Sequence, residues 1–139
     1  MLNRYQQFGK KSEGVAARHL VRNGYSILEQ NYRTKQGEID IIAKDGDTIV
    51  FVEVKARRSD HFGNPKWAVT PKKQKKILML ALYYLKATKQ SNAKARFDVV
   101  TLSSRRPEAG NIQRLGTKEE NDDTFRIEII KNAFEAAYE

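Results

Sequence analysis

The chain has 139 residues, a length that fits one domain built around one hydrophobic core. It contains no cysteine and only two histidines, which excludes disulfides and thiolate-bound zinc and disfavours a histidine-built metal centre. Any metal should therefore bind to carboxylate oxygens, the ligands that suit Mg²⁺ or Mn²⁺.

The net charge of +9 is concentrated in one part of the chain. Residues 1–102 contain 20 Lys and Arg against 9 Asp and Glu, whereas residues 103–139 contain 6 against 8. This asymmetry suits a polyanionic partner such as a phosphate backbone, although a well-solvated basic surface explains the charge alone equally well. We see neither a secretory signal nor an apolar run of the ~20 residues that span a bilayer, so we expect a cytoplasmic protein without a membrane partner.

The first predicted element is a helix over residues 9–23, ended by Asn23-Gly24. The residues on its inward stripe are Gly9, Glu13, Ala16, Ala17 and Leu20. Glu13 lies within this stripe, where a lone carboxylate is costly to bury, and a metal ion or Lys55 would compensate its charge. The alternative is that Glu13 stays solvated in the first turn of the helix.

The next elements are three strands, over residues 25–33, 38–44 and 48–55. The last two flank Asp45-Gly46-Asp47, which is a strong hairpin signal. Thr70-Pro71 combines a capping residue with proline at the first helical position, so it predicts the start of a second helix. We expect this helix to run to about residue 89.

The rest of the chain is predicted to hold a strand over residues 95–102, a mobile loop over 103–123, a strand over 124–130 and a short helix over 132–138. The resulting order, α-β-β-β-α-β-β, predicts an α/β fold. We expect residues 1–139 to form a single domain with a central mixed β-sheet flanked by helices.

Strand alternation brings two acids and a lysine to one face of the predicted hairpin. Glu53 and Lys55 point to the same side of their strand because they are two residues apart. With a two-residue Asp45-Gly46 turn, Asp40 lies opposite Phe51 and diagonal to Glu53, at a backbone separation of roughly 7–8 Å. A three-residue loop would instead place Asp40 and Glu53 on opposite faces.

These residue types match the needs of phosphodiester hydrolysis. We predict that Asp40, Glu53 and Glu13 hold a metal ion that polarises the phosphate and activates water, and that Lys55 supports the developing negative charge. Glu53-Val54-Lys55 alone is equally typical of an ion pair on an edge strand. A helical acid, an acid before the turn and a Glu-x-Lys after it form a more specific pattern.

Several short stretches spread over nearly the whole chain match a known pattern: Gly24-Tyr25, Asn31, Gly37-Glu38-Ile39-Asp40, Phe51-Val52-Glu53-Val54-Lys55, Arg57, Arg96-Phe97-Asp98-Val99-Val100 and Asn132-Ala133-Phe134. They closely resemble the bacterial YraN-like family, which is similar to archaeal Holliday junction resolvases. Both belong to the restriction-endonuclease-like superfamily, known by its PD-(D/E)xK signature.

The resemblance implies a restriction-endonuclease-like fold, Mg²⁺-dependent cleavage of DNA and, from the resolvases, a homodimer. By motif, Glu13 matches the helical acid, Asp40 the acid of the first half of the signature, and Glu53 and Lys55 the second half. Ile39 stands where the signature has proline, a frequent departure that leaves the metal site intact.

Candidate contacts to nucleic acid lie beside these acids. Arg57 and Arg58 begin the long connection over residues 56–69. The start of the second helix adds further candidates: Lys72, Lys73, Gln74, Lys75 and Lys76. Four lysines at a helix N-terminus interact unfavourably with the helix dipole. A phosphate docked at this end would offset the unfavourable free energy. Solvated lysines, and a Gln74 amide that only caps a sheet edge, are the alternatives.

The sequence therefore favours an Mg²⁺-dependent endonuclease acting on DNA, with branched or otherwise structured DNA as a candidate substrate. The main alternative is a nucleic-acid-binding module that keeps the fold without catalysis. A protein-interaction domain with structural carboxylates is a third class, which leaves the basic asymmetry unexplained.

Overall fold

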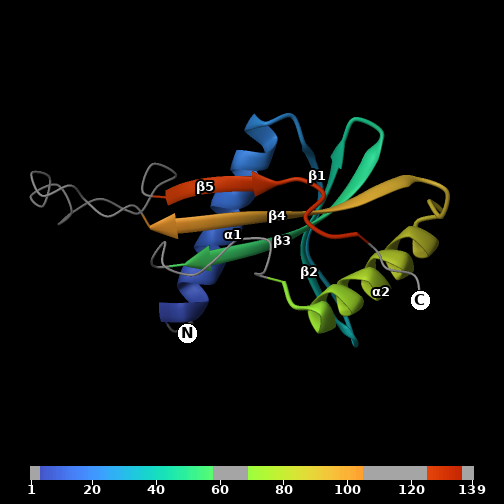
Figure 1. The fold of residues 1–139 in the computed structure, drawn as a ribbon, viewed down its shortest axis with the longest axis horizontal. Coiled ribbons are helices and arrows are strands. Elements are labelled where there is room, and N and C mark those ends of the chain that lie inside the picture. The colour runs from blue at the N-terminus through green and yellow to red at the C-terminus, as the bar shows by residue number, and fades with distance from the viewer. Residues whose placement is uncertain (1–3, 58–68, 105–124, 136–139) are drawn as a thin grey trace, which may run out of the picture.

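The computed structural model describes residues 4–57, 69–104 and 125–135. Its elements are α1 (Arg4–Arg22), β1 (Ser26–Thr34), β2 (Gly37–Asp45), β3 (Thr48–Arg57), α2 (Pro71–Ala87), β4 (Lys94–Ser104) and β5 (Phe125–Ile130) (Figure 1). The predicted element order is confirmed, and the first helix begins earlier than expected. No helix of the described portion is long and apolar enough to cross a membrane.

Two predictions near the C-terminus need correction or lie outside this description. The structure forms turns rather than a helix over residues 131–135, and residues 136–139 are outside the described ranges. Of the segment predicted as a mobile loop over residues 103–123, the first two residues belong to β4, and the rest lies outside the described residues.

The five strands form one mixed sheet in the order β1-β2-β3-β4-β5. The β3–β4 pair is parallel, whereas the other three pairs are antiparallel. A parallel pair needs a crossover connection, and α2 lies in the connection between β3 and β4. The predicted α/β class with a mixed sheet flanked by helices is confirmed.

Each helix covers one face of this sheet. Val15, Ala16 and Leu20 of α1 belong to one buried cluster with Val50 and Val52 of β3. The alternate residues of the same strands face a second buried cluster, whose α2 members are Ile77, Leu80, Ala81, Tyr84 and Leu85. The small Ala16 lets α1 approach the sheet closely, as its predicted inward stripe requires.

The β2–β3 turn differs from its predicted position by one residue. Asp45 pairs with Thr48, so the two turn residues are Gly46 and Asp47 rather than Asp45 and Gly46. Gly46 has φ +62, and glycine adopts this conformation at the first turn position without steric cost. The shift moves the pairing by two residues, so Phe51 pairs with Ile42 instead of the predicted Asp40. An even shift keeps the predicted alternation of faces along the paired part of the hairpin.

The β2–β3 ladder ends at the pair Ile41–Val52, and the two strands then part. Beyond this point β2 stays paired with β1, whereas β3 stays paired with β4 (Figure 1). Strand alternation is interrupted here: Ile39 and Ile42 are three residues apart, yet both belong to the buried cluster under α2. We call this region the fork, and the predicted acids surround it.

A separate buried carboxylate ties the other end of the sheet together. Asp98 of β4 is fully buried and accepts hydrogen bonds from Tyr25 Oη (2.8 Å), Arg96 Nε (3.0 Å) and Asn132 N (2.9 Å). Arg96 also pairs with Asp45 at 2.6 Å, next to the hairpin turn. All of these partners are protein groups, so this network has the character of a structural cross-link.

Candidate functional site

Asp40 lies at the fork, where its side chain replaces the missing strand partner of β3. Its Oδ2 accepts a hydrogen bond from Val54 N at 2.8 Å. Burial, together with the nearby Glu53 and Glu13 carboxylates, raises the pKa of Asp40 to about 7, although the Val54 hydrogen bond opposes the shift. Asp40 is thus held where a negative charge is unfavourable unless a cation accompanies it.

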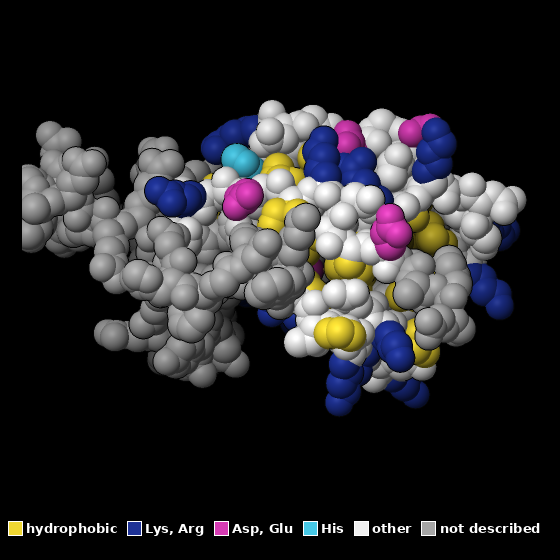
Figure 2. All heavy atoms as spheres, in the orientation of Figure 1, with side chains coloured by type: hydrophobic (Ala, Val, Ile, Leu, Met, Phe, Trp, Pro, Cys, Tyr) yellow, Lys and Arg dark blue, Asp and Glu magenta, His cyan; other side chains and the backbone are white. Residues whose placement is uncertain are grey.

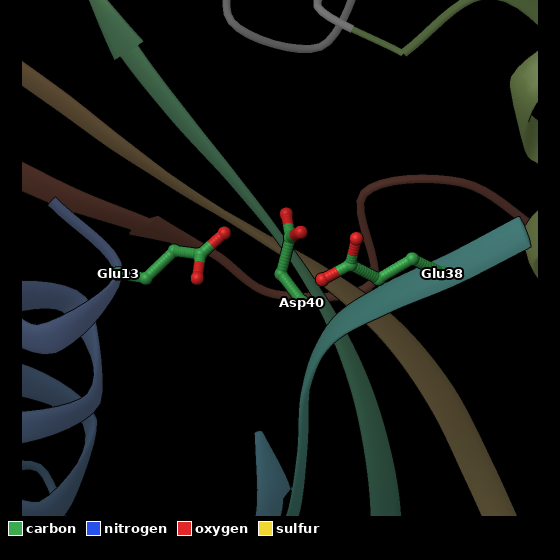
Figure 3. A group of neighbouring side chains, drawn as sticks. All are labelled: Glu13, Glu38 and Asp40. Atoms are coloured by element: carbon green, nitrogen blue, oxygen red, sulfur yellow. The ribbon is translucent and has the colours of Figure 1, made fainter. Parts of the chain in front are cut away.

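Asp40 belongs to a cluster of three carboxylates, together with Glu13 of α1 and Glu38 of β2. One oxygen of each lies within 4.8 Å of the others, and Figure 3 shows the three groups turned toward one another. Burial raises the pKa of Glu13, and the Glu38 charge adds to this effect. Glu38 was not among the predicted site residues, although its position two residues before Asp40 on one strand was the available signal.

Asn31 of β1 supports this cluster and was also missed as a site residue. With its amide nitrogen facing the acids, it donates to Glu13 Oε2 at 2.9 Å and to Glu38 Oε1 at 2.7 Å. Its backbone has φ +55, a conformation that asparagine tolerates better than most residues. On the outer side of the cluster, Arg33 Nε lies 3.4 Å from Glu38 Oε2.

Glu53 lies across the fork and is paired with lysines. It is 5% exposed, although most buried carboxylates need a compensating charge. Lys73 Nζ of α2 hydrogen-bonds its Oε1, and Lys55 Nζ lies 3.9 Å from the same oxygen. Burial and the Lys73 charge lower the pKa of Lys55, and the opposing effect of the Glu53 and Asp40 charges does not cancel this shift. For Lys73, burial lowers the pKa, but the Glu53 pair outweighs burial and leaves it raised.

The start of α2 is fixed as the sequence predicts. Thr70 caps the helix by accepting from Lys73 N at 3.2 Å, and Pro71 occupies the first turn. The cap thus fixes the first turn of α2, the turn from which the Lys73 side chain reaches Glu53. Gln74 Nε2 donates to Val69 O at 2.9 Å, so in this structure its amide fastens the segment before the helix.

The remaining predicted contacts to nucleic acid lie at the surface or outside the description. Lys72, Lys75 and Lys76 are exposed, and Figure 2 shows basic side chains projecting from the lower edge of the molecule, where α2 lies. Arg57 is the last residue of β3, and its side chain, like all of Arg58, lies outside the described residues.

The structure thus brings Glu13, Asp40, Glu53 and Lys55 together at the fork, from one helix and two strands. It adds Glu38, Asn31 and Lys73 to their surroundings. Carboxylate oxygens that converge in this way form a donor set that fits a hard divalent cation such as Mg²⁺. The roles of these residues in metal binding and catalysis stay predictions.

A mixed five-stranded sheet with one helix on each face and this site at its fork is consistent with a nuclease-like α/β fold. Residues 12–102 match the family described as "Uncharacterised protein family UPF0102", and the chain belongs to this family.

Curated relatives confirm this membership over nearly the whole chain. A UPF0102 protein of Desulfosudis oleivorans is 47% identical over 136 residues, which cover 98% of this chain and 96% of that protein. A UPF0102 protein of Syntrophus aciditrophicus is 52% identical over 130 residues, which cover 94% of this chain and 90% of that protein. Among solved structures, Pyrococcus furiosus SfsA in complex with Ca²⁺ matches 68% of this chain and 56% of that chain at 16% identity, with a TM-score of 0.35.

Proposed function

We propose that this protein is an Mg²⁺- or Mn²⁺-dependent endonuclease that hydrolyses phosphodiester bonds in DNA. The observation that carries the proposal is the convergence of Glu13, Glu38, Asp40 and Glu53 around one fork, where the pKa of Asp40 is raised to about 7. Carboxylates held this close repel one another, and proteins tolerate such a local cost mainly where function requires it.

Each residue has a role that follows from its position. Asp40 lies between the other acids and is the central ligand, and Glu13 and Glu38 offer further oxygens from one side of the fork. Glu53 offers a fourth carboxylate from the other side. A bound divalent cation supplies Lewis-acid polarisation of the phosphate and lowers the pKa of a coordinated water. Asn31 orients the Glu13 and Glu38 carboxylates by its two hydrogen bonds.

Lys55 provides a positive charge on the strand face that carries Glu53. Its side chain is 32% exposed, so its ammonium group reaches the solvent side of the site, where a substrate phosphate would lie. There it stabilises the negative charge that develops on the phosphate during attack by water. The exposed lysines at the start of α2 and the basic residues 57 and 58 provide contacts to the flanking backbone.

Cleavage of a panel of linear, nicked, flapped and four-way DNA substrates in the presence of Mg²⁺ or Mn²⁺ tests the proposal. We expect cleavage that EDTA abolishes and that Asp40→Asn reduces by at least about 100-fold, because one ligand and its charge are lost. Asp47→Asn is the matched control, since this exposed turn residue lies away from the fork. Metal-independent DNA binding without cleavage would instead favour the non-catalytic binding module, and cleavage unaffected by Asp40→Asn would refute the site.

A further inference from the structure

The four carboxylates of the site differ in their partners. Glu13, Glu38 and Asp40 face one another, whereas Glu53 is engaged by two ammonium groups. Lys73 makes the closer contact of the two, and it reaches Glu53 from a different element than the strand that carries Lys55. The most buried of the four acids is therefore the one that two lysine side chains accompany.

An ammonium group on a carboxylate oxygen competes directly with a divalent cation for that oxygen. Lys73 Nζ contacts Glu53 Oε1, so a cation can share this oxygen only against the repulsion of the lysine. Lys55 lies farther from the same oxygen, at 3.9 Å, and presents less of an obstacle. Glu53 thus offers this oxygen to a cation without competition from Lys73 only when Lys73 finds another anionic partner.

A DNA phosphate is such a partner. The Lys73 side chain is 41% exposed and belongs to the helix turn that also carries the exposed Lys72, so its ammonium group can turn from Glu53 toward a phosphate without unfolding α2. Lysine has a long flexible side chain with freely rotating donors, which suits such an exchange.

We infer that Lys73 couples DNA binding to assembly of the metal site: it holds Glu53 in the free protein and releases this carboxylate when a DNA phosphate becomes its partner. This inference rests on the proposed function. Premature metal binding at the complete donor set is thereby disfavoured, and substrate and cation each raise the affinity of the protein for the other.

Calorimetric titration with Mn²⁺ tests this coupling without any measurement of turnover. The titration is made with and without a short duplex whose phosphorothioate backbone resists hydrolysis. For the wild type, we expect the duplex to tighten Mn²⁺ binding by about tenfold, within the roughly 5- to 150-fold range of coupled sites. For Lys73→Ala, we expect tight Mn²⁺ binding already without DNA and a coupling factor close to one.

Lys86→Ala is the matched control, because it removes the same charge from an exposed position in the last turn of the same helix, at the opposite end from Lys73. We expect it to keep the coupling of the wild type. Lys73→Met keeps most of the side-chain length and replaces Lys73→Ala if thermal unfolding shows that the alanine variant is not folded. The inference is overturned if the Lys73 and Lys86 variants bind Mn²⁺ alike in both conditions.

The same titrations separate this inference from the proposed function. If the wild type binds Mn²⁺ in neither condition, the proposed metal site itself is wrong. If the wild type binds Mn²⁺ and Asp40→Asn abolishes binding, but the Lys73 variant keeps the full coupling factor, the site stands and only the role of Lys73 is refuted.

Discussion

The ionisation of Asp40 provides a test of whether this carboxylate serves function or stabilises the fold. Its pKa is about 7 in the folded protein, against 3.8 for an ordinary aspartate. Between pH 4 and pH 7 the folded state therefore keeps a proton that the unfolded state has lost. The contribution of Asp40 to stability falls as pH rises through this window, and above pH 7 its charge destabilises the fold.

We accordingly expect Asp40→Asn to stabilise the metal-free protein at pH 8 by about 1–3 kcal/mol and to flatten the change in stability between pH 4 and 7. Asparagine can still accept from Val54 N, so the hydrogen bond at the fork is retained. Urea unfolding at pH 5 and pH 8 in EDTA measures both effects. A loss of stability at pH 8 would show that Asp40 serves the fold.

Asn31 and Glu38 show why residue-level prediction from the sequence was incomplete. The sequence pattern brought out Asp40, Glu53 and Lys55, because the strand period places them on one face. The contact between Asn31 and two acids depends on the positive φ of Asn31 and on how β1 pairs with β2, which no local pattern reveals. Lys73 was predicted as a phosphate contact, and its pairing with Glu53 depends on how α2 crosses β3.

At the scale of the elements, the hairpin and both helices were predictable because periodicity, turn residues and caps agree with one another. The position of the turn was not, because Asp45-Gly46-Asp47 permits two adjacent two-residue turns. In the structure Gly46 takes the first turn position. Asp45, the residue before the turn, stays in β2 and forms an ion pair with Arg96. The fork itself depends on which neighbour each strand keeps, which is a property of the whole sheet.

The Asp98 network provides the structural counterpart to the fork. Asp98→Ala would leave Arg96 and Tyr25 without their buried partner, and we expect a loss of about 3–5 kcal/mol. Tyr25→Phe removes two hydrogen bonds, the one donated to Asp98 and the one accepted from Arg96 Nη2, and should cost about 1–3 kcal/mol. Urea unfolding measures both losses. Mn²⁺ binding by the folded Tyr25→Phe protein should match the wild type, and weakened binding would contradict the separation of the two sites.

The Tyr25 hydroxyl also adds an alkaline component to stability. Burial and the hydrogen bond to Asp98 raise the pKa of Tyr25 to about 12 from an ordinary 10.0. The folded state therefore keeps the phenolic proton between pH 10 and 12, and the stabilisation present below pH 10 is lost as pH rises through this window. Tyr25→Phe should remove this component, and alkaline unfolding followed by circular dichroism checks it. An unchanged alkaline transition in the variant would assign the loss to other groups.

For the whole molecule, the basic excess of residues 1–102 predicts strongly salt-dependent DNA binding. The triple variant Lys72→Ala, Lys75→Ala and Lys76→Ala should lower the log–log slope by up to about 3 units, since each phosphate contact contributes about 0.9. A control triple variant at the exposed Lys35, Lys44 and Lys86 should change the slope less. Fluorescence anisotropy at several salt concentrations measures the slopes, and equal changes would exclude the start of α2 as the principal contact.

The central claim is that the fork holds a divalent cation, and anomalous diffraction from crystals grown with Mn²⁺ tests it most directly. We predict an anomalous peak within coordination distance of Asp40 and of at least one of Glu13, Glu38 and Glu53, and no such peak in Asp40→Asn crystals. A protein saturated with Mn²⁺ that shows no peak at the fork would contradict the account.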